Sequence, residues 1–344
     1  MNSVDRARLT VRSPADLIAA VPYLLGFHPA DSVVVVALRG RRIVFAARAD
    51  LPGTGDDPLD PATHLAGVIA RQGAESATVL GYGDAPRVTP AVDAVRQSLA
   101  VAGLAVLDAL RVTGGRYWSY LCAEPACCPP DGTPYDAGAS EVSAAAVYAG
   151  QVALPDRAAL TAQVAPFDGP ARMAMRQAVA SAERRRDELV VGQSTDDLID
   201  GRALRRAGMT AVRAAMRGQR RGERLTDDEL AWLTLLLTHL PVRDHAWERT
   251  DGRERDIALW TDVLRRAAPE LIAAPGSLLA FAAWRAGQGA LAAVALERVI
   301  EAHPNYSLAL LLDDLLRRGV PPSRLDGWPA VDAPGMLRRR RRRG

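Results

Sequence analysis

Lysine is absent from this 344-residue chain, so each of its 43 basic residues is an arginine. Several kinds of enzyme depend on a lysine ammonium group: P-loop phosphate binders, Schiff-base enzymes, protein kinases and enzymes with a Ser–Lys dyad. The sequence excludes all of these mechanisms. The abundance of alanine, glycine and proline indicates codon bias in a GC-rich genome as the cause of the missing lysine.

Cysteine is also scarce, because the chain has only Cys122, Cys127 and Cys128. Residues 1–13 mix charged and short apolar side chains and lack the apolar core of a secretory signal. The most apolar helical stretch, residues 230–240, has about half the length that a bilayer-spanning helix needs. We therefore expect a cytoplasmic protein with no membrane contact and no disulfide framework.

The net charge of +3 depends on a run of arginines at the C-terminus, Arg338 to Arg343. Without that run the rest of the chain is slightly acidic, so the folded part does not have the charge of a nucleic-acid-binding surface. The run itself could bind phosphates in a non-specific, salt-sensitive way. We expect residues 323–344 to form a flexible, arginine-rich tail.

The first part of the chain predicts an α/β domain over residues 1–139, in which helices flank a mixed sheet. Ser13 and Asp16 have the spacing of a capping box, and Pro14 suits the first position of a helix that runs to Gly26. The β-branched run that follows indicates a buried central strand. The pattern predicts strands at residues 8–12, 32–38, 43–49, 77–80, 104–112 and 116–122, and further helices at 62–72 and 90–102.

From Ser140 onward the strand pattern ends, and residues 140–322 predict an all-α domain. Small residues around Gly287, followed by Pro304, are typical of a tetratricopeptide-like helical unit, which we place near residues 278–317. On this unit Trp284 and Tyr306 are candidate contacts for a protein partner. Predicted helices cover residues 158–164, 171–189, 203–217, 226–239, 253–268, 277–285, 290–302 and 305–317.

The densest group of rare side chains follows the last long strand. Arg111, Arg116, Tyr117 and Trp118 lie beside the glycine turn 114–115, where guanidinium and aromatic groups could stack on a planar or phosphorylated ligand. His28, after the first helix, could act there as a general base. The alternative is that the aromatic side chains simply cover the sheet and that His28 orders its loop.

The three cysteines form a second candidate site, in which four intervening residues separate Cys122 from the vicinal pair Cys127–Cys128. A structural zinc ion normally has four protein ligands, and no histidine or cysteine follows nearby. Zinc binding is therefore one alternative, a redox switch between Cys122 and Cys127 is a second, and burial as small apolar residues is a third. On this pattern alone we predict no cofactor.

Several strings in the chain resemble an uncharacterised actinobacterial family, domain of unknown function 4192. One group is residues 13–17, 21–29 and 31–32; the others are residues 114–122 with 127–130, Arg243–Asp244 with Trp247, Trp260, and residues 283–285 through Pro304. Tyr117 stands where such relatives often carry tryptophan. The resemblance implies a cytoplasmic protein of high-GC bacteria, and it carries over no catalytic residues.

The sequence thus leaves the function open between three classes. A non-catalytic protein that binds a ligand with its α/β half and a protein partner with its helical half agrees best with the lack of a complete catalytic motif. The alternative is an enzyme that acts on a small phosphorylated or nucleotide-like substrate at the α/β domain. Non-specific nucleic-acid binding through the arginine tail is the third.

Overall fold

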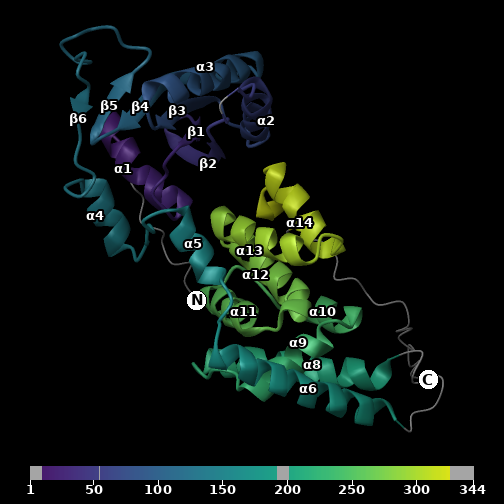
Figure 1. Ribbon diagram of the computed structural model, residues 1–344. Coiled ribbons are helices and arrows are strands. Elements are labelled where there is room, and N and C mark those ends of the chain that lie inside the picture. Colours follow the sequence, from purple (N-terminus) through teal and green to yellow (C-terminus); the bar gives the residue numbers. More distant parts are fainter. Residues whose placement is uncertain (1–9, 54, 192–200, 326–344) are drawn as a thin grey trace, which may run out of the picture.

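The computed structural model of the protein describes residues 10–53, 55–191 and 201–325. Its N-terminal half is a six-stranded mixed sheet with helices on both faces, and its C-terminal half is built from helices (Figure 1). This arrangement confirms the predicted α/β half followed by a helical half. The strands are β1 (Ser32–Arg39), β2 (Arg42–Asp50), β3 (Ser76–Tyr82), β4 (Ala105–Thr113), β5 (Arg116–Ser119) and β6 (Thr133–Pro134).

The strand order in the sheet is β2-β1-β3-β4-β5-β6. β1 pairs with β2 and β3 in antiparallel fashion, whereas β3 and β4 are parallel and are connected by a helix. The valines of β1 are buried because helices cover both faces of the sheet. The glycine turn 114–115 joins β4 and β5 as an antiparallel hairpin, and both glycines have the positive φ that such tight turns require.

Helices α2 (Leu59–Ala70) and α3 (Ala85–Val101) cover one face of the sheet, and α1 (Pro14–Leu25) covers the other (Figure 1). The predicted capping box at the start of α1 is present in full. α3 begins at Ala85, five residues before the predicted start at Pro90. Pro86 is the proline of its first turn, and Pro90 lies inside the helix. The predicted strand at residues 8–12 is wrong for residues 10–12, which form no strand; the remainder lies outside the described residues.

The C-terminal half follows α4 (Glu141–Tyr148) and α5 (Arg157–Val164). The helices that the structure describes after α5 are α6 (Pro170–Val190), α8 (Arg202–Arg220), α9 (Asp227–Leu236), α10 (Leu240–Trp247), α11 (Glu254–Arg266), α12 (Ala273–Arg285), α13 (Gly289–Ala302) and α14 (Ser307–Arg317). Two 3₁₀ turns, η1 (Pro269–Leu271) and η2 (Pro322–Leu325), complete it. The helix predicted over residues 226–239 is α9, which ends three residues early at Leu236, and a separate helix, α10, begins at Leu240 with Pro241 in its first turn.

Successive helices from α11 to α14 pack against one another and share one large apolar core with α6, α8 and α9. α12 and α13 approach closely at Gly276 of α12, where an added Cβ would lie 2.2 Å from the Val299 side chain of α13. The end of α14 also meets the α/β half: the backbone oxygens of residues 317–319 accept hydrogen bonds from His64 in the middle of α2 and from Arg71 and Gln72 just after its end. The two halves are therefore in direct contact.

The predicted tail starts within η2, at residue 323, and its arginine run Arg338 to Arg343 lies outside the described residues. Among the helices that the structure describes, none combines the length and the apolar character needed to cross a membrane.

Candidate metal centre

A loop of residues 120–132 connects β5 to β6 and carries all three cysteines. β5 and β6 pair directly, with Arg116 opposite Pro134 and Tyr117 opposite Thr133. Because the two strands are neighbours in the sheet, the loop leaves and re-enters the sheet at adjacent points. We call this segment the cysteine loop.

Trp118 of β5 holds the returning end of the cysteine loop. Its indole Nε1–H donates to the backbone oxygen of Pro130 at 2.9 Å. The guanidinium of Arg111, the register partner of Trp118 on β4, stacks over the indole at 3.7 Å from the ring centroid. Gly132 lies against the same ring, because an added Cβ would be 2.5 Å from the indole. The loop is therefore packed onto Trp118 at a distance that only glycine permits.

A second tether comes from Arg116, whose Nη1 donates to the backbone oxygens of Gly132 at 2.7 Å and Asp131 at 3.2 Å. Backbone oxygens in a loop would otherwise accept hydrogen bonds from water. Because one guanidinium bonds two of these oxygens, it fixes the path of the chain. Arg116 and Trp118 together bind three consecutive residues of the loop, 130–132. The end of the cysteine loop that leads into β6 is thus held by side chains of β5.

Ser119 fixes the departing end, and with it Cys122. Its Oγ donates to Asp108 Oδ1 at 2.7 Å and accepts the amide hydrogens of Leu121 and Cys122, both at 3.1 Å. These bonds turn the chain away from the sheet. Strand β5 therefore ends at Ser119, and the predicted continuation of the strand to Cys122 is wrong.

The vicinal cysteines lie on a turn closed by Glu124. The backbone oxygen of Glu124 accepts the amide hydrogens of Cys127 at 3.2 Å and Cys128 at 2.8 Å. This turn brings the chain back toward Cys122, which is why residues separated by four intervening positions meet. All three cysteines are free thiols, with Cys127 exposed and the other two half-buried.

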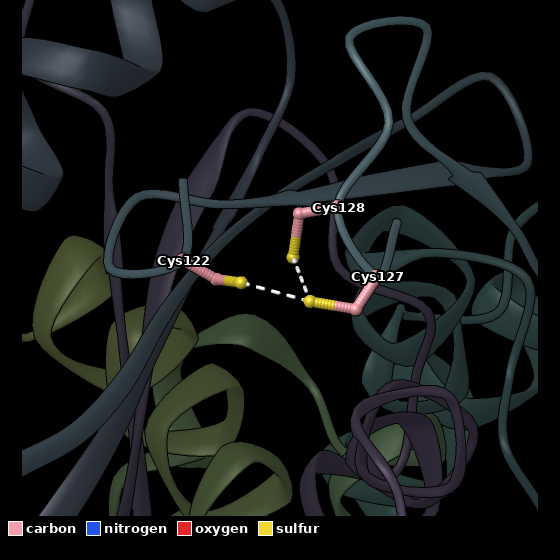
Figure 2. A group of neighbouring side chains, drawn as sticks. All are labelled: Cys122, Cys127 and Cys128. Carbon is pink, nitrogen blue, oxygen red and sulfur yellow. Dashed lines mark hydrogen bonds between the residues drawn. The ribbon is translucent and has the colours of Figure 1, made fainter. Parts of the chain in front are cut away.

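The three Sγ atoms point toward one another (Figure 2). Cys122 Sγ is 3.0 Å from Cys127 Sγ, which is 3.8 Å from Cys128 Sγ, and all three lie within 4.8 Å of one another. Among the described residues this is the one group of three or more cysteine, histidine or acidic ligand atoms that lie this close together. The spacing of the thiols is suited to one shared ion.

The three thiols differ in acidity because they share hydrogen bonds with one another. Hydrogen bonds from Cys127 and Cys128 stabilise the Cys122 thiolate and lower the pKa of Cys122. The bond to Cys122 raises the pKa of Cys127, and it is also the main cause that raises the pKa of Cys128 to about 12. Cys122 is therefore the thiol that most readily forms a thiolate, which is the reactive form of cysteine.

This difference predicts the order of alkylation in the reduced, metal-free protein. At neutral pH iodoacetamide is expected to label Cys122 first, because the thiolate reacts and the pKa of Cys122 is the one that is lowered. Raising the pH should recruit Cys127, and Cys128 should be labelled last. Fragment-ion mass spectrometry of the peptide containing all three residues measures the order; first labelling of Cys128 would contradict the assignment.

A family model described as Domain of unknown function (DUF4192) matches residues 14–323, which include the entire sheet and the cysteine loop. The chain belongs to this family. DUF4192 membership confirms the family resemblance seen in the sequence. Neither the curated proteins nor the solved structures include a match to the chain.

In this DUF4192 chain the predicted stacking cluster is largely engaged with itself. Arg111 and Trp118 stack on each other, Arg116 bonds the cysteine loop, and Tyr117 packs against Tyr135 with ring centroids 6.4 Å apart. His28 is exposed between α1 and β1. Within the described residues it shares no hydrogen bond or ion pair with the four others, and ligand binding by this group stays a prediction.

The two predicted partner contacts lie in the helical half. Trp284 is 6% exposed, and its Nε1 donates to the backbone oxygen of Val320 at 3.1 Å. Tyr306 is half-buried beside Arg243, and burial is the main cause that raises the pKa of its hydroxyl. A groove of about 1290 Å³ between α5, α6 and α13, lined by Phe167, Met175 and Arg298 among others, includes neither residue. Partner binding by this half stays a prediction.

Sequence reasoning missed the residues that position the thiols. Asp108 and Ser119 orient Cys122, and the carbonyl of Glu124 orients the vicinal pair. For Asp108 the sequence did offer a signal, because it is an acidic residue within one predicted strand of the hairpin, across from the end of the other. The backbone carbonyl of Glu124 had no signal, because any residue type supplies one.

Gly132 gives a direct test of the tethering in this DUF4192 chain. Gly132→Ala is expected to displace the loop from Trp118 and to destabilise the fold by about 1–3 kcal/mol, because a Cβ would clash with the ring and the φ of +79° is strained for alanine. Thermal unfolding measures the loss of stability, and the difference in tryptophan fluorescence between the folded wild type and the folded variant reports the change around Trp118, whose ring contacts residue 132. Gly115→Ala is the matched control, since it has a similar φ of +70° but no atom within 4 Å of the added Cβ. Equal losses in the two variants would contradict a contact-based tether.

Proposed function

We propose that this protein is a metal-binding protein that holds zinc with the thiolates of Cys122, Cys127 and Cys128. The observation that carries the proposal is the convergence of three Sγ atoms within 4.8 Å on a loop that is tethered at both ends. Three soft thiolates suit zinc or monovalent copper and do not suit magnesium or calcium. The loop brings together side chains that a random surface segment would keep apart.

The distances support a shared ion. In a tetrahedral site with Zn–S bonds of about 2.3 Å, neighbouring sulfur atoms are about 3.8 Å apart. Cys127 and Cys128 already have this separation, at 3.8 Å. Cys122 and Cys127, at 3.0 Å, would need to separate by less than about 1 Å to bind the ion in this way.

Three protein ligands leave the fourth tetrahedral position for a water molecule or another small ligand. Zinc sites of this open kind hold a bound water or substrate, whereas closed sites with four protein ligands are structural. Cys127 is exposed, so the fourth position would face solvent. The proposed ion would thus be accessible from outside as well as firmly held.

Competition against a chromophoric zinc chelator tests the proposal with the reduced full-length protein. The expected result is binding of about one ion per chain with an affinity that falls as the pH is lowered, because protons compete for the thiolates. Glu124→Gln is the matched control: it removes a carboxylate from the same loop and is expected to leave the affinity unchanged. If the wild-type protein does not compete with the chelator for zinc, the proposal of a zinc protein is overturned. Binding of copper(I) without binding of zinc would show that the thiolates hold a different metal ion.

We infer that residues 278–317 form a tetratricopeptide-like unit that serves a protein partner. The support is the packing of α12, α13 and α14 in succession and the close approach of α12 to α13 at Gly276. Gly276→Ala should separate this pair, because its Cβ would overlap Val299.

A further inference from the structure

Cys122 and Cys127 form the closest Sγ–Sγ contact in the cysteine loop. Cys122 Sγ and Cys127 Sγ are 3.0 Å apart, closer than the separation of about 3.8 Å that a tetrahedral zinc ion imposes. A disulfide would draw the same two atoms to about 2.05 Å. Metal binding moves the pair apart and oxidation moves it together, so the two states exclude each other.

We propose that a peroxide oxidises Cys122 and Cys127 to a disulfide and thereby releases the bound metal ion. This inference rests on the proposed zinc site and adds its regulation. Loss of two of three thiolates leaves Cys128 as the single remaining sulfur ligand. One thiolate does not hold zinc against water and cellular chelators, so the ion leaves.

The reaction balances with hydrogen peroxide as the oxidant. The Cys122 thiolate attacks one peroxide oxygen, the O–O bond breaks, and hydroxide leaves, which gives a sulfenic acid at Cys122. Cys127 sulfur then attacks the Cys122 sulfur, the S–O bond breaks, and a second hydroxide leaves. Two electrons pass from the two sulfurs to the peroxide, three protons convert the two hydroxides to water and Cys128 to its thiol, and the zinc ion is released.

The geometry assigns the disulfide to Cys122 and Cys127. Their Sγ atoms are 3.0 Å apart, whereas Cys127 Sγ is 3.8 Å from Cys128 Sγ, so the Cys122–Cys127 pair needs the smaller movement to form a bond. Cys127 is also the exposed member of the three, which leaves this pair open to a small oxidant. The tethers through Trp118 and Arg116 involve backbone oxygens of residues 130–132, so they can persist in both states.

Peroxide titration of the zinc-loaded, full-length protein tests this inference. Released zinc is followed with a chromogenic chelator, and disulfides are mapped by mass spectrometry of the same samples. The expected result is about one ion released per Cys122–Cys127 disulfide formed, with rebinding after reduction by a dithiol. Cys128→Ser separates oxidation from binding, because this variant keeps the reacting pair and is expected to form the same disulfide in the metal-free state.

The outcomes distinguish the two proposals. Failure of the untreated protein to bind zinc would overturn the proposed function. Zinc binding that survives peroxide with all thiols reduced would overturn only the release. A disulfide between Cys127 and Cys128, or between Cys122 and Cys128, would also overturn it, because the geometry assigns the reaction to the nearest pair.

Discussion

Replacing Cys122 with serine is expected to weaken zinc binding about 100-fold or more. Structural zinc sites with four ligands bind with about 10–16 kcal/mol, so one thiolate contributes on the order of 3 kcal/mol, or two powers of ten in affinity. Cys122 is the residue on which both other thiols converge, and its pKa is lowered. A serine hydroxyl stays protonated at neutral pH and is a poor substitute.

The affinity of the Cys122→Ser variant is measured by the same chelator competition, with circular dichroism to confirm the fold. The chain has no cysteine outside the site, so the matched control is Ala126→Ser, which adds a hydroxyl to the same exposed loop without removing a thiol. The control is expected to bind as the wild type does. An affinity for Cys122→Ser within about threefold of the wild type, less than the loss of one ligand, would contradict the assignment of Cys122.

Trp260→Ala is expected to lower the free energy of unfolding by about 3–5 kcal/mol, the usual effect of truncating a fully buried tryptophan. Trp260 of α11 is 0% exposed in the apolar core of the helical half. Its Nε1 donates to Thr250 Oγ1 at 2.9 Å, and that hydroxyl is buried as well. The substitution removes packing and a hydrogen bond together.

Two variants separate those contributions in chemical denaturation. Trp260→Phe keeps most of the ring volume and loses the hydrogen bond, so we expect a smaller loss, about 1–2 kcal/mol. Leu310→Ala on the outer side of α14, where Leu310 is 43% exposed, is the surface control and should change stability by less than about 0.5 kcal/mol. A Trp260→Ala loss as small as that of Leu310→Ala would contradict the packing described for this core.

Local patterns predicted the fold well wherever one short-range rule dominated. The valines of β1, the capping box at Ser13 and the glycine turn 114–115 each led to the observed element. Errors arose where two rules competed. Pro90 resembled a helix start, but Pro86 supplies the first turn, and the apolar run after Thr226 concealed the break before α10.

The sequence predicted which cysteines form the site, but it did not predict the contacts that hold them together. The spacing of Cys122 from Cys127–Cys128 showed three thiols that could meet, and they do. The tethers could not be inferred, because Trp118 and Arg116 bond backbone oxygens more than ten positions away, which any sequence supplies. The same side chains predicted a ligand platform, since side-chain type alone does not distinguish a group that stacks on a ligand from one that stacks on Arg111.

X-ray absorption spectroscopy at the zinc edge, on the zinc-loaded and reduced protein, tests the central claim most directly. A shell of three sulfur atoms at about 2.3 Å plus one oxygen or nitrogen atom is the predicted result. In the Cys122→Ser variant the sulfur count should fall to about two, because one thiolate is gone. A wild-type shell with no sulfur, or the same sulfur count in both proteins, would contradict a metal centre built from the three cysteines.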